Sequence, residues 1–155
     1  MKETYAPNES IGFLTYRISY LLKRDLERQF ELSKIPVSAE EYPILVYLWD
    51  RDAKTQAEIA EKVGKDRPRI TRLLDRLEQE GLIQRILKPN DRREKLVVLT
   101  KKGKKLERPA KKEALKNLDR AFGWASAEQM EQINGFIRKA IVIMESREEE
   151  SRNLK

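Results

Sequence analysis

The sequence predicts a mainly α-helical protein with one small β-hairpin, and three observations support this prediction. Apolar residues recur at helical spacing over most of the 155 residues. A short helical segment, a glycine and a second helical segment follow one another within residues 56–79. Residues 82–100 hold two short β-type runs around a charged tip. We therefore expect a helix-turn-helix core followed by a hairpin, with further helices before and after it in the chain.

Three helix starts have the capping-box pattern. In this pattern a Ser or Thr hydroxyl accepts from the backbone N–H three residues on, and a Glu or Gln side chain reaches back. The pattern occurs at residues 38–41, 55–58 and 126–129, each time ahead of an apolar periodic run. One match alone would be weak, whereas three in these positions indicate three helix starts.

The first two helices are expected at residues 10–31 and 39–49, with a break before Pro36. Pro43 stands late for a first-turn proline, so the start of the second helix should be distorted. The first helix has an apolar stripe formed by Ile11, Leu14, Ile18, Leu21, Leu22, Leu26 and Phe30.

The third and fourth helices form the predicted helix-turn-helix. The third, at residues 56–63, should end at Gly64 in a left-handed cap. Asp66 is the expected N-cap of the fourth, with Pro68 tolerated in its first turn and Gly81 at its end. The core face of the fourth helix is predicted to be Ile70, Leu73, Leu74 and Leu77.

The hairpin strands are expected at residues 82–87 and 96–100, where β-branched residues are frequent. A narrow minor groove of DNA attracts basic side chains such as those of the tip, residues 90–95. Asp91 can orient the Arg93 guanidinium through a bidentate pair, or it can serve the turn through the backbone, and both roles stay open. An ordinary exposed hairpin is the alternative for the whole segment. The basic tip residues are Arg92, Arg93 and Lys95.

Two further helices are expected, one following Lys101 and one at residues 127–147. Pro109 should kink the former or mark its true start. The latter is apolar on more than one side, which is costly for a monomer and natural in a core shared by two chains. The alternative is that one chain buries both sides. The predicted dimer interface consists of Ile11, Leu14, Ile18, Ile133, Ile137, Ile141 and Met144.

Cysteine and histidine are both absent from the sequence. Disulfides and thiolate metal sites are therefore excluded, and the usual general base near neutral pH is missing. Paired acids such as Glu40 and Glu41 stand at helix starts, where capping explains them. We expect no enzymatic activity, no metal and no cofactor. Because no signal pattern or membrane-length apolar run occurs, we expect a cytoplasmic protein with no membrane partner.

The positive charge is concentrated in one segment. Residues 63–105 hold 14 Lys and Arg against 6 Asp and Glu, so this surplus of 8 exceeds the net charge of +7 of the whole chain. Such a segment is typical of a nucleic-acid-binding protein. A membrane surface fits less well, because the arginines accompany turns and strands and not one amphipathic helix.

The fourth helix places three arginines and a threonine in its first two turns. If its apolar face packs on the third helix, these side chains point outward from the end that a recognition helix inserts into the major groove. Arginine can pair with a guanine edge, and threonine can meet thymine or a phosphate. A solvated helix with incidental arginines is the alternative, but the charge surplus and the hairpin favour DNA. The residues are Arg67, Arg69, Thr71 and Arg72.

Three stretches resemble those of a known family. They are residues 55–60, residues 70–83, and an Asp-x-Arg wing at 91–93 followed by a Leu-Thr-x-x-Gly junction within 96–103. Together they are similar to the MarR family of winged helix-turn-helix transcriptional regulators, over nearly the whole chain. The resemblance implies a homodimer, formed by N- and C-terminal helices, that binds pseudo-palindromic double-stranded DNA and is usually a repressor.

Carried onto this sequence, the resemblance implies that Arg93 enters the minor groove with Asp91 as its orienter. It implies that the first turns of the fourth helix enter the major groove through Arg67, Pro68, Arg69, Thr71 and Arg72. The proline and the several arginines depart from the family's commoner small, hydroxyl-rich start, so the bases that are read stay open. Phosphate contacts are predicted for Thr55, Arg76 and Lys101.

Many family members release DNA when a small aromatic or phenolic molecule binds between the dimer and DNA-binding parts. Others sense oxidants through cysteine or bind zinc through histidine, and the lack of both residues argues against those modes here. An effector pocket is predicted beside Tyr16, Tyr20 and Tyr42, whose alternative role is plain core or interface packing.

The sequence thus predicts a DNA-binding region at residues 37–100 and a helical dimerisation region made of residues 1–36 and 101–155. The predicted function is that of a sequence-specific repressor, released by a small effector. The alternative is an architectural nucleic-acid-binding protein, with similar affinity for any sequence and a steep salt dependence. A winged helix that contacts only proteins would not need an arginine-rich wing.

Overall fold

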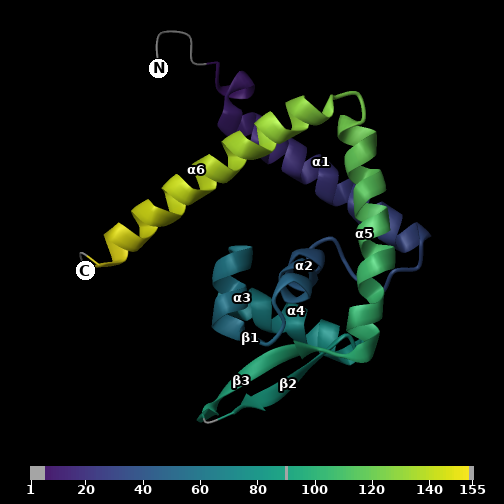
Figure 1. Ribbon diagram of the computed structural model, residues 1–155, viewed down its shortest axis with the longest axis vertical. Helices are drawn as coiled ribbons and strands as arrows, with labels where there is room; N and C mark the ends of the chain where they lie inside the picture. The colour runs from purple at the N-terminus through teal and green to yellow at the C-terminus, as the bar shows by residue number, and fades with distance from the viewer. Residues whose placement is uncertain (1–5, 90, 154–155) are drawn as a thin grey trace. The chain divides into compact units, whose positions relative to one another are not determined.

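The computed structural model describes residues 6–89 and 91–153, apart from the side chains of Arg92 and Asn153 (Figure 1). The predicted fold class is confirmed: the protein is mainly helical with a small antiparallel sheet. The elements in chain order are η1 (Pro7–Glu9), α1 (Ile11–Leu32), α2 (Tyr42–Asp50), β1 (Lys54–Thr55), α3 (Gln56–Val63), α4 (Arg67–Gln79), β2 (Ile83–Lys88), β3 (Asp91–Leu99), α5 (Lys101–Phe122) and α6 (Ala127–Asn153).

The chain divides into two compact units, the first ending at Asn117 and the second beginning at Leu118. The first contains the helix-turn-helix, the sheet, α1 and most of α5. The second contains the end of α5 and all of α6. The predicted division into a DNA-binding region at 37–100 and a dimerisation region is a division by function, which this boundary does not test.

Local chemistry sets the helix ends of the helix-turn-helix. The Thr55 hydroxyl accepts from the Glu58 N–H (3.2 Å), and the Glu58 carboxylate accepts from the Thr55 N–H (2.7 Å), which is the predicted capping box. α3 ends at Gly64 in the left-handed region, at φ 65°. Asp66 then caps α4 by accepting from the Arg69 N–H at 2.8 Å. All three predicted boundaries are confirmed.

The start of α2 is irregular, as Pro43 predicts. α2 begins at Tyr42 and not at Ala39, although Ser38 and Glu41 form their reciprocal cap with N–H to oxygen distances of 3.2 and 2.8 Å. Because Pro43 has no N–H to donate to the Ala39 carbonyl, the preceding turn is not continuous with regular helix.

β3 is the central strand of a sheet with the order β1-β3-β2 (Figure 1). β2 pairs antiparallel with β3, from Ile83 opposite Leu99 to Lys88 opposite Asp91, with an irregularity after Leu87. β1 was not predicted, because two residues provide no periodicity to recognise. The second strand was predicted from residue 96, but β3 begins at Asp91, so residues 91–95 of the expected tip belong to the strand and Asn90 lies outside the described residues.

Thr100 joins the sheet to α5, which explains the Leu-Thr-x-x-Gly junction. Its N–H donates to the Leu82 carbonyl (3.0 Å), its hydroxyl donates to the Gly81 carbonyl (2.6 Å), and the Gly103 N–H donates to the Thr100 hydroxyl (3.0 Å). A Cβ atom at Gly103 would lie 2.0 Å from the Leu82 carbonyl oxygen. Only glycine therefore allows α5 to pass this close to the start of β2.

In the first unit, α5 is tied to α1 by a buried amide. Asn117 Nδ2 donates to the Leu22 carbonyl (3.2 Å) and to Asp25 Oδ2 (2.8 Å). α5 continues through Pro109, so this proline does not mark the helix start. The second unit contains α6, whose start at Ser126 and Gln129 shows the third predicted reciprocal cap. α6 extends to Asn153, past the predicted end at residue 147.

The buried core of the first unit is formed by the helix-turn-helix and the sheet together with residues of α1, α2 and α5. Four predicted apolar residues of the third and fourth helices, Ile59, Ile70, Leu74 and Leu77, are fully buried. The core also contains Phe30, Ile44, Leu45, Leu48, Leu82, Ile83, Val97 and Ala110. None of the helices in the described part of the chain has the length and apolar character that a membrane span requires.

Candidate nucleic-acid interface

Two arginines of α4 are exposed and, in the described structure, unengaged, Arg72 on the outward face and Arg67 at the start of the helix. At about 100° per residue, Arg72 and Pro68 lie opposite the buried stripe of this helix, and both are exposed. Arg67 is exposed at the first helical position. Within the described residues, neither the Arg67 nor the Arg72 guanidinium has a hydrogen-bond or ion-pair partner. Both can therefore accept a new partner without losing an existing one.

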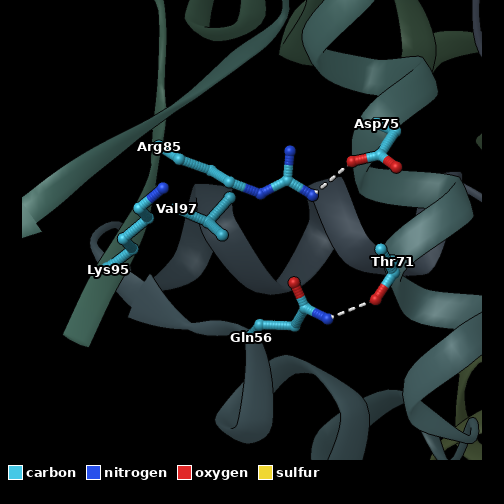
Figure 2. A pocket seen from close by; sticks show the side chains of 6 residues that line it. All are labelled: Gln56, Thr71, Asp75, Arg85, Lys95 and Val97. Atoms are coloured by element: carbon cyan, nitrogen blue, oxygen red, sulfur yellow. Dashed lines mark hydrogen bonds and ion pairs between the residues drawn. The ribbon is translucent and has the colours of Figure 1, made fainter. Parts of the chain in front are cut away.

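The Thr71 hydroxyl is already engaged. It donates to the Arg67 carbonyl (2.9 Å) and accepts from Gln56 Nε2 (2.6 Å), so it connects the start of α3 to α4 (Figure 2). The side chain is half-buried. Thr71 was predicted to contact DNA in the major groove, but this geometry gives its hydroxyl a role within the helix-turn-helix, and its methyl group is the part left for a base.

Two other arginines of α4 face acidic residues. Arg69 Nη2 lies 2.5 Å from Glu40 Oε1, and Arg76 Nε lies 3.4 Å from Glu41 Oε1. Arg69 and Arg76 are seven residues apart, so they share one side of the helix. Glu41 is fully buried, and its Oε1 accepts no hydrogen bond in the described structure. Arg76 therefore compensates a buried charge, and Arg69, predicted as a base reader, is held by an internal partner.

Glu40 also binds Lys65, whose Nζ lies 2.9 Å from the same carboxylate oxygen. Burial raises the pKa of the Glu40 carboxyl, but the hydrogen bond and charge of Lys65 outweigh this effect, aided by Lys23 and Arg69. The pKa of Glu40 consequently lies below its ordinary value, and the group stays ionised near neutral pH. The sequence offered no signal for these pairs, because the partners lie 25 and 29 residues apart.

Arg85 connects the hairpin to α4. From β2 its guanidinium reaches Asp75 Oδ1 (2.7 Å) and Glu78 Oε2 (2.5 Å), and its backbone N–H donates to Glu78 Oε1 (3.0 Å). Figure 2 shows Arg85 extending from the sheet towards Asp75 of α4. The side chain is only 18% exposed. The sequence analysis did not single out this residue. Its one signal is that Arg85 follows buried Ile83 by two positions, and alternate residues of a strand point to the same face.

A hollow of about 370 Å³ lies between the start of α3, α4 and the sheet. Figure 2 shows its lining side chains converging from these three elements. The rim holds basic Lys95, which is exposed, while the Arg85 and Thr71 side chains close the wall nearest α4. The lining residues are Gln56, Thr71, Asp75, Arg85, Lys95 and Val97.

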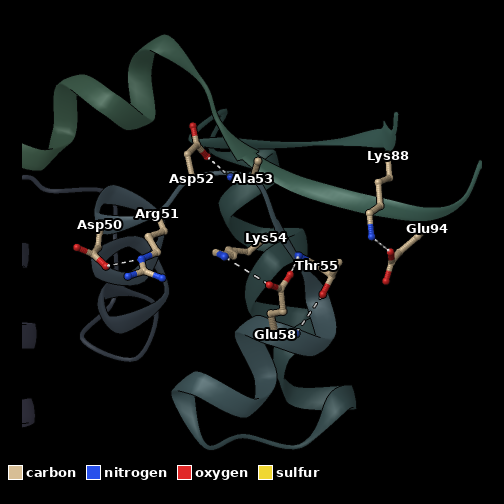
Figure 3. Close-up of polar contacts among 9 residues, drawn as sticks. All are labelled: Asp50, Arg51, Asp52, Ala53, Lys54, Thr55, Glu58, Lys88 and Glu94. Carbon is tan, nitrogen blue, oxygen red and sulfur yellow. Dashed lines mark hydrogen bonds and ion pairs between the residues drawn. The ribbon is translucent and has the colours of Figure 1, made fainter. Parts of the chain in front are cut away.

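The hairpin itself is stiffened by an ion pair between its strands, Lys88 Nζ to Glu94 Oε2 at 2.5 Å (Figure 3). Asp91 Oδ1 accepts from the Arg93 backbone N–H at 3.0 Å, which is the turn role of Asp91. Within the described residues no contact joins Asp91 to the Arg93 guanidinium, so the orienting role is not seen in this structure. Arg93 is exposed, and the Arg92 side chain lies outside the described part.

The three residues predicted to contact phosphates are placed differently. Thr55 is buried and its hydroxyl caps α3, so it positions that helix and does not face solvent (Figure 3). Arg76 keeps 58% of its side chain exposed beside Glu41, and Lys101 is exposed at the start of α5. Asp52 fixes the nearby sheet end, because its carboxylate accepts from the Ala53 and Leu99 N–H groups, both at 2.9 Å.

The three tyrosines of the predicted effector pocket do not converge. Tyr16 and Tyr20 are exposed on α1, and the Tyr20 ring lies 5.7 Å from the Arg24 guanidinium carbon. Tyr42 packs edge-on against Phe30 and Trp49. Tyr42 does line an open hollow of about 830 Å³, whose other lining residues are Pro43, Val46, Tyr47, Trp49, Asp50, Lys62, Val63 and Lys111.

The residues of the predicted dimer interface keep large exposed areas in the single chain. In the first unit Ile11 is 78% and Leu14 is 50% exposed, while Ile18 is half-buried. On α6 of the second unit, the predicted stripe of Ile133, Ile137, Ile141 and Met144 is 39–58% exposed. Phe136, Val142 and Ile143 of α6 are exposed as well.

Residues 37–95 match the sequence model of the MarR family. The organic hydroperoxide resistance transcriptional regulator of Bacillus subtilis (strain 168) is 31% identical over 93 residues, which cover 59% of this chain and 63% of that protein. The chain therefore matches slightly less than two thirds of this curated relative.

Solved structures match over a larger share of the chain. A MarR-family regulator from Rhodococcus sp. RHA1 has a TM-score of 0.80 and 25% identity, covering 88% of this chain and 96% of that one. CouR from Rhodococcus jostii RHA1, bound to p-coumaroyl-CoA, has a TM-score of 0.76 and 26% identity, covering 88% and 95%. The repressor CouR bound to a 23-mer DNA duplex, at 24% identity and a TM-score of 0.77 over 91% and 99%, shows the fold alone.

Proposed function

The chain belongs to the MarR family of transcriptional regulators, and from this premise we propose that it is a cytoplasmic, homodimeric repressor that binds a pseudo-palindromic DNA operator. The observation that carries the proposal is a recognition helix whose Arg67 and Arg72 are exposed and have no partner among the described residues, bridged by Arg85 to a basic hairpin. Such a pair can meet the major groove and the adjacent minor groove of one duplex. The proposed activity is binding and not catalysis.

In the major groove, we assign base recognition to Arg67 and Arg72. Their guanidinium groups are exposed and unpaired in the described structure, and arginine forms a bidentate pair with a guanine edge. Pro68 and the Thr71 methyl group supply apolar contacts, for example to a thymine methyl. Arg69 is a weaker candidate for base reading because Glu40 already binds its guanidinium.

In the minor groove, we assign the contact to Arg93, with Lys95 and the neighbouring Arg92 adding positive charge. The Arg93 guanidinium is exposed near the end of the hairpin, and the Asp91 carboxylate holds the Arg93 backbone. The enhanced negative potential of a narrow minor groove favours such a side chain. Lys101 and Arg76 are proposed phosphate contacts, while Thr55 supports them by capping α3.

A two-fold operator needs two recognition helices about 34 Å apart, and each chain supplies one. The second must therefore come from a second copy. Exposed apolar area on α1 in the first unit, and on α6 in the second, supports a shared core, because large apolar patches mark interaction surfaces. We propose that Ile11, Leu14 and Ile18 contribute to this core together with the α6 stripe.

A second proposal concerns an effector. Tyr42, Tyr47 and Trp49 line the hollow of about 830 Å³, and Lys62 and Lys111 bring positive charge to it. Aromatic walls with basic side chains suit an aromatic molecule that carries a carboxylate or another anionic group. Tyr16 and Tyr20 are not part of this hollow, so the proposed site keeps only Tyr42 of the three predicted tyrosines.

Selection of bound duplexes from a random DNA pool tests the repressor proposal. We expect a two-fold consensus in which each half-site contains a guanine, with protection of one adjacent minor groove per half-site. An architectural protein would instead enrich no consensus and bind the starting pool as tightly as the final one. Recovery of a consensus without two-fold symmetry would contradict the proposed homodimer.

A further inference from the structure

The turn before α2 presents an acidic side chain to the basic helix-turn-helix. Glu40 Oε1 is shared by Lys65 Nζ at 2.9 Å and Arg69 Nη2 at 2.5 Å. Lys65 lies between α3 and α4, and Arg69 lies in the first turn of α4. One carboxylate thus binds two of the cations at the end of the recognition helix that is proposed to approach DNA.

The backbone on both sides of Glu40 is held in place. The preceding Ala39 N–H donates to Glu27 Oε2 of α1 at 2.5 Å, and the following Glu41 is fixed by its reciprocal bonds with Ser38. The Glu40 side chain is only 20% exposed. Because the backbone is fixed and the side chain is mostly covered, the ion pairs with the two cations cost less conformational entropy than those of a fully exposed glutamate would.

Glu40 and a DNA phosphate compete for the same donors. A guanidinium or ammonium group that forms an ion pair with Glu40 must leave that partner, or share it, before it binds a phosphate oxygen. Binding to unselected DNA depends almost wholly on phosphate contacts, whereas operator binding also depends on base contacts. Arg72 points to the outward face of α4, has no partner in the described structure and is unaffected by Glu40.

We propose that Glu40 is a specificity-determining residue that withholds Lys65 and Arg69 from DNA phosphates and so lowers affinity for unselected DNA more than for the operator. This inference rests on the proposed DNA-binding function. On the operator, base contacts fix one register of α4, and the ion pairs with Glu40 persist. Unselected DNA offers no specific base contacts. Nothing there compensates for the two phosphate contacts that Lys65 and Arg69 do not make.

The test compares Glu40→Gln with wild type on the selected operator and on a random duplex of equal length, over a range of salt concentrations. We expect affinity for the random duplex to rise roughly three-fold or more, and the slope of log K against log salt to steepen by about 1 to 2, because each added phosphate contact contributes about 0.9. Operator affinity should rise less, so the ratio of the two affinities should fall.

Glu107→Gln is the matched control, because it removes the same charge and a comparable ion pair, Glu107 to Lys111 at 2.6 Å. A rise of both affinities equal to that of the control would reduce the effect to net charge and overturn the proposal. A loss of operator binding with random binding unchanged would also overturn it, since Glu40 would then position Arg69 for base reading.

A second variant keeps the inference testable if Glu40→Gln does not fold. In otherwise wild-type protein, Arg69→Gln should leave the salt slope on random DNA nearly unchanged, because Glu40 already holds this cation. Lys101→Gln should lower the slope by about 1. An equal decrease for both variants would refute the role of Glu40. Failure of the wild-type protein to bind any duplex would instead refute the proposed function.

Discussion

Arg93 has the exposure and the backbone support that a groove-inserting arginine requires. Its side chain has no partner within the described residues, and the Asp91 carboxylate holds its N–H. The energetic cost of removing the side chain should therefore appear in DNA binding and not in folding.

We predict that Arg93→Ala weakens operator binding by about 1–3 kcal/mol, because a guanidinium in the minor groove loses both its charge and its contacts. Fluorescence anisotropy with an operator duplex measures the loss, and thermal unfolding should stay within a few degrees of wild type. Unchanged operator affinity at equal salt would show that the hairpin does not reach DNA.

Arg72 and Lys101 should differ in what their removal changes. Arg72→Ala is predicted to alter the preferred bases and to lower operator affinity by about 1–3 kcal/mol, because Arg72 is the outward arginine of α4. Lys101→Ala should weaken all sequences alike and lower the salt slope by about 1. A repeated selection from random duplexes distinguishes the two, and an unaltered consensus for Arg72→Ala would reassign Arg72 to a phosphate.

At the scale of elements, the hairpin and α4 act as one body through Arg85. The two acids that it bridges, Asp75 and Glu78, lie about one turn apart on α4. Figure 2 shows the ion pair of Arg85 with Asp75, which lines the hollow. Because Arg85 is mostly buried, the bridge limits the angle between hairpin and recognition helix more than a surface ion pair would.

We predict that Arg85→Met lowers operator affinity about ten-fold or more, although Arg85 need not touch DNA. The substitution frees the hairpin and leaves two acids unpaired beside the duplex, which repel phosphates. Lys88→Met is the control, since it removes an equal charge and a pair within the hairpin alone. Hydroxyl-radical footprinting should show loss of minor-groove protection for Arg85→Met, and equal footprints for both variants would contradict the bridging role.

At the scale of the whole molecule, the division of the core is uneven. The first unit has a buried core, to which Phe30 of α1 and Ala110 of α5 contribute, whereas Ile11 and Leu14 of α1 and the predicted stripe of α6 are exposed. This difference supports the proposal that exposed apolar residues of α1 and α6 form a core shared with a second copy.

We predict that Ile137→Glu abolishes the dimer, because burial of an unpaired carboxylate in an apolar seam costs several kcal/mol. Sedimentation at micromolar concentration should show dimeric wild type and a monomeric or unfolded variant that loses cooperative operator binding. Ser146→Glu, nine residues later on α6 and so about 180° from Ile137 around the helix, adds the same charge outside the predicted stripe and should remain dimeric. A wild-type monomer that protects both half-sites would leave only assembly on DNA.

Much of the architecture was predictable because it depends on residues close together in the chain. The capping boxes at Thr55 and Ser126, the left-handed Gly64 and the Asp66 cap each involve neighbours within a few positions. The helical segments were also predictable, because apolar residues recur in them at helical spacing. The charge surplus of residues 63–105 likewise pointed to DNA without any knowledge of the fold.

Only the tertiary structure decided which of the basic side chains are free. Arg67, Arg69, Arg72 and Arg76 look equivalent in the sequence, yet Glu40 and Glu41 bind two of them. β1, the Arg85 bridge and the position of Gly103 against Leu82 also join residues that are distant in the chain. An ion pair depends on where two side chains meet in space, whereas a cap or a helix depends on adjacent residues, and local sequence patterns describe only the latter.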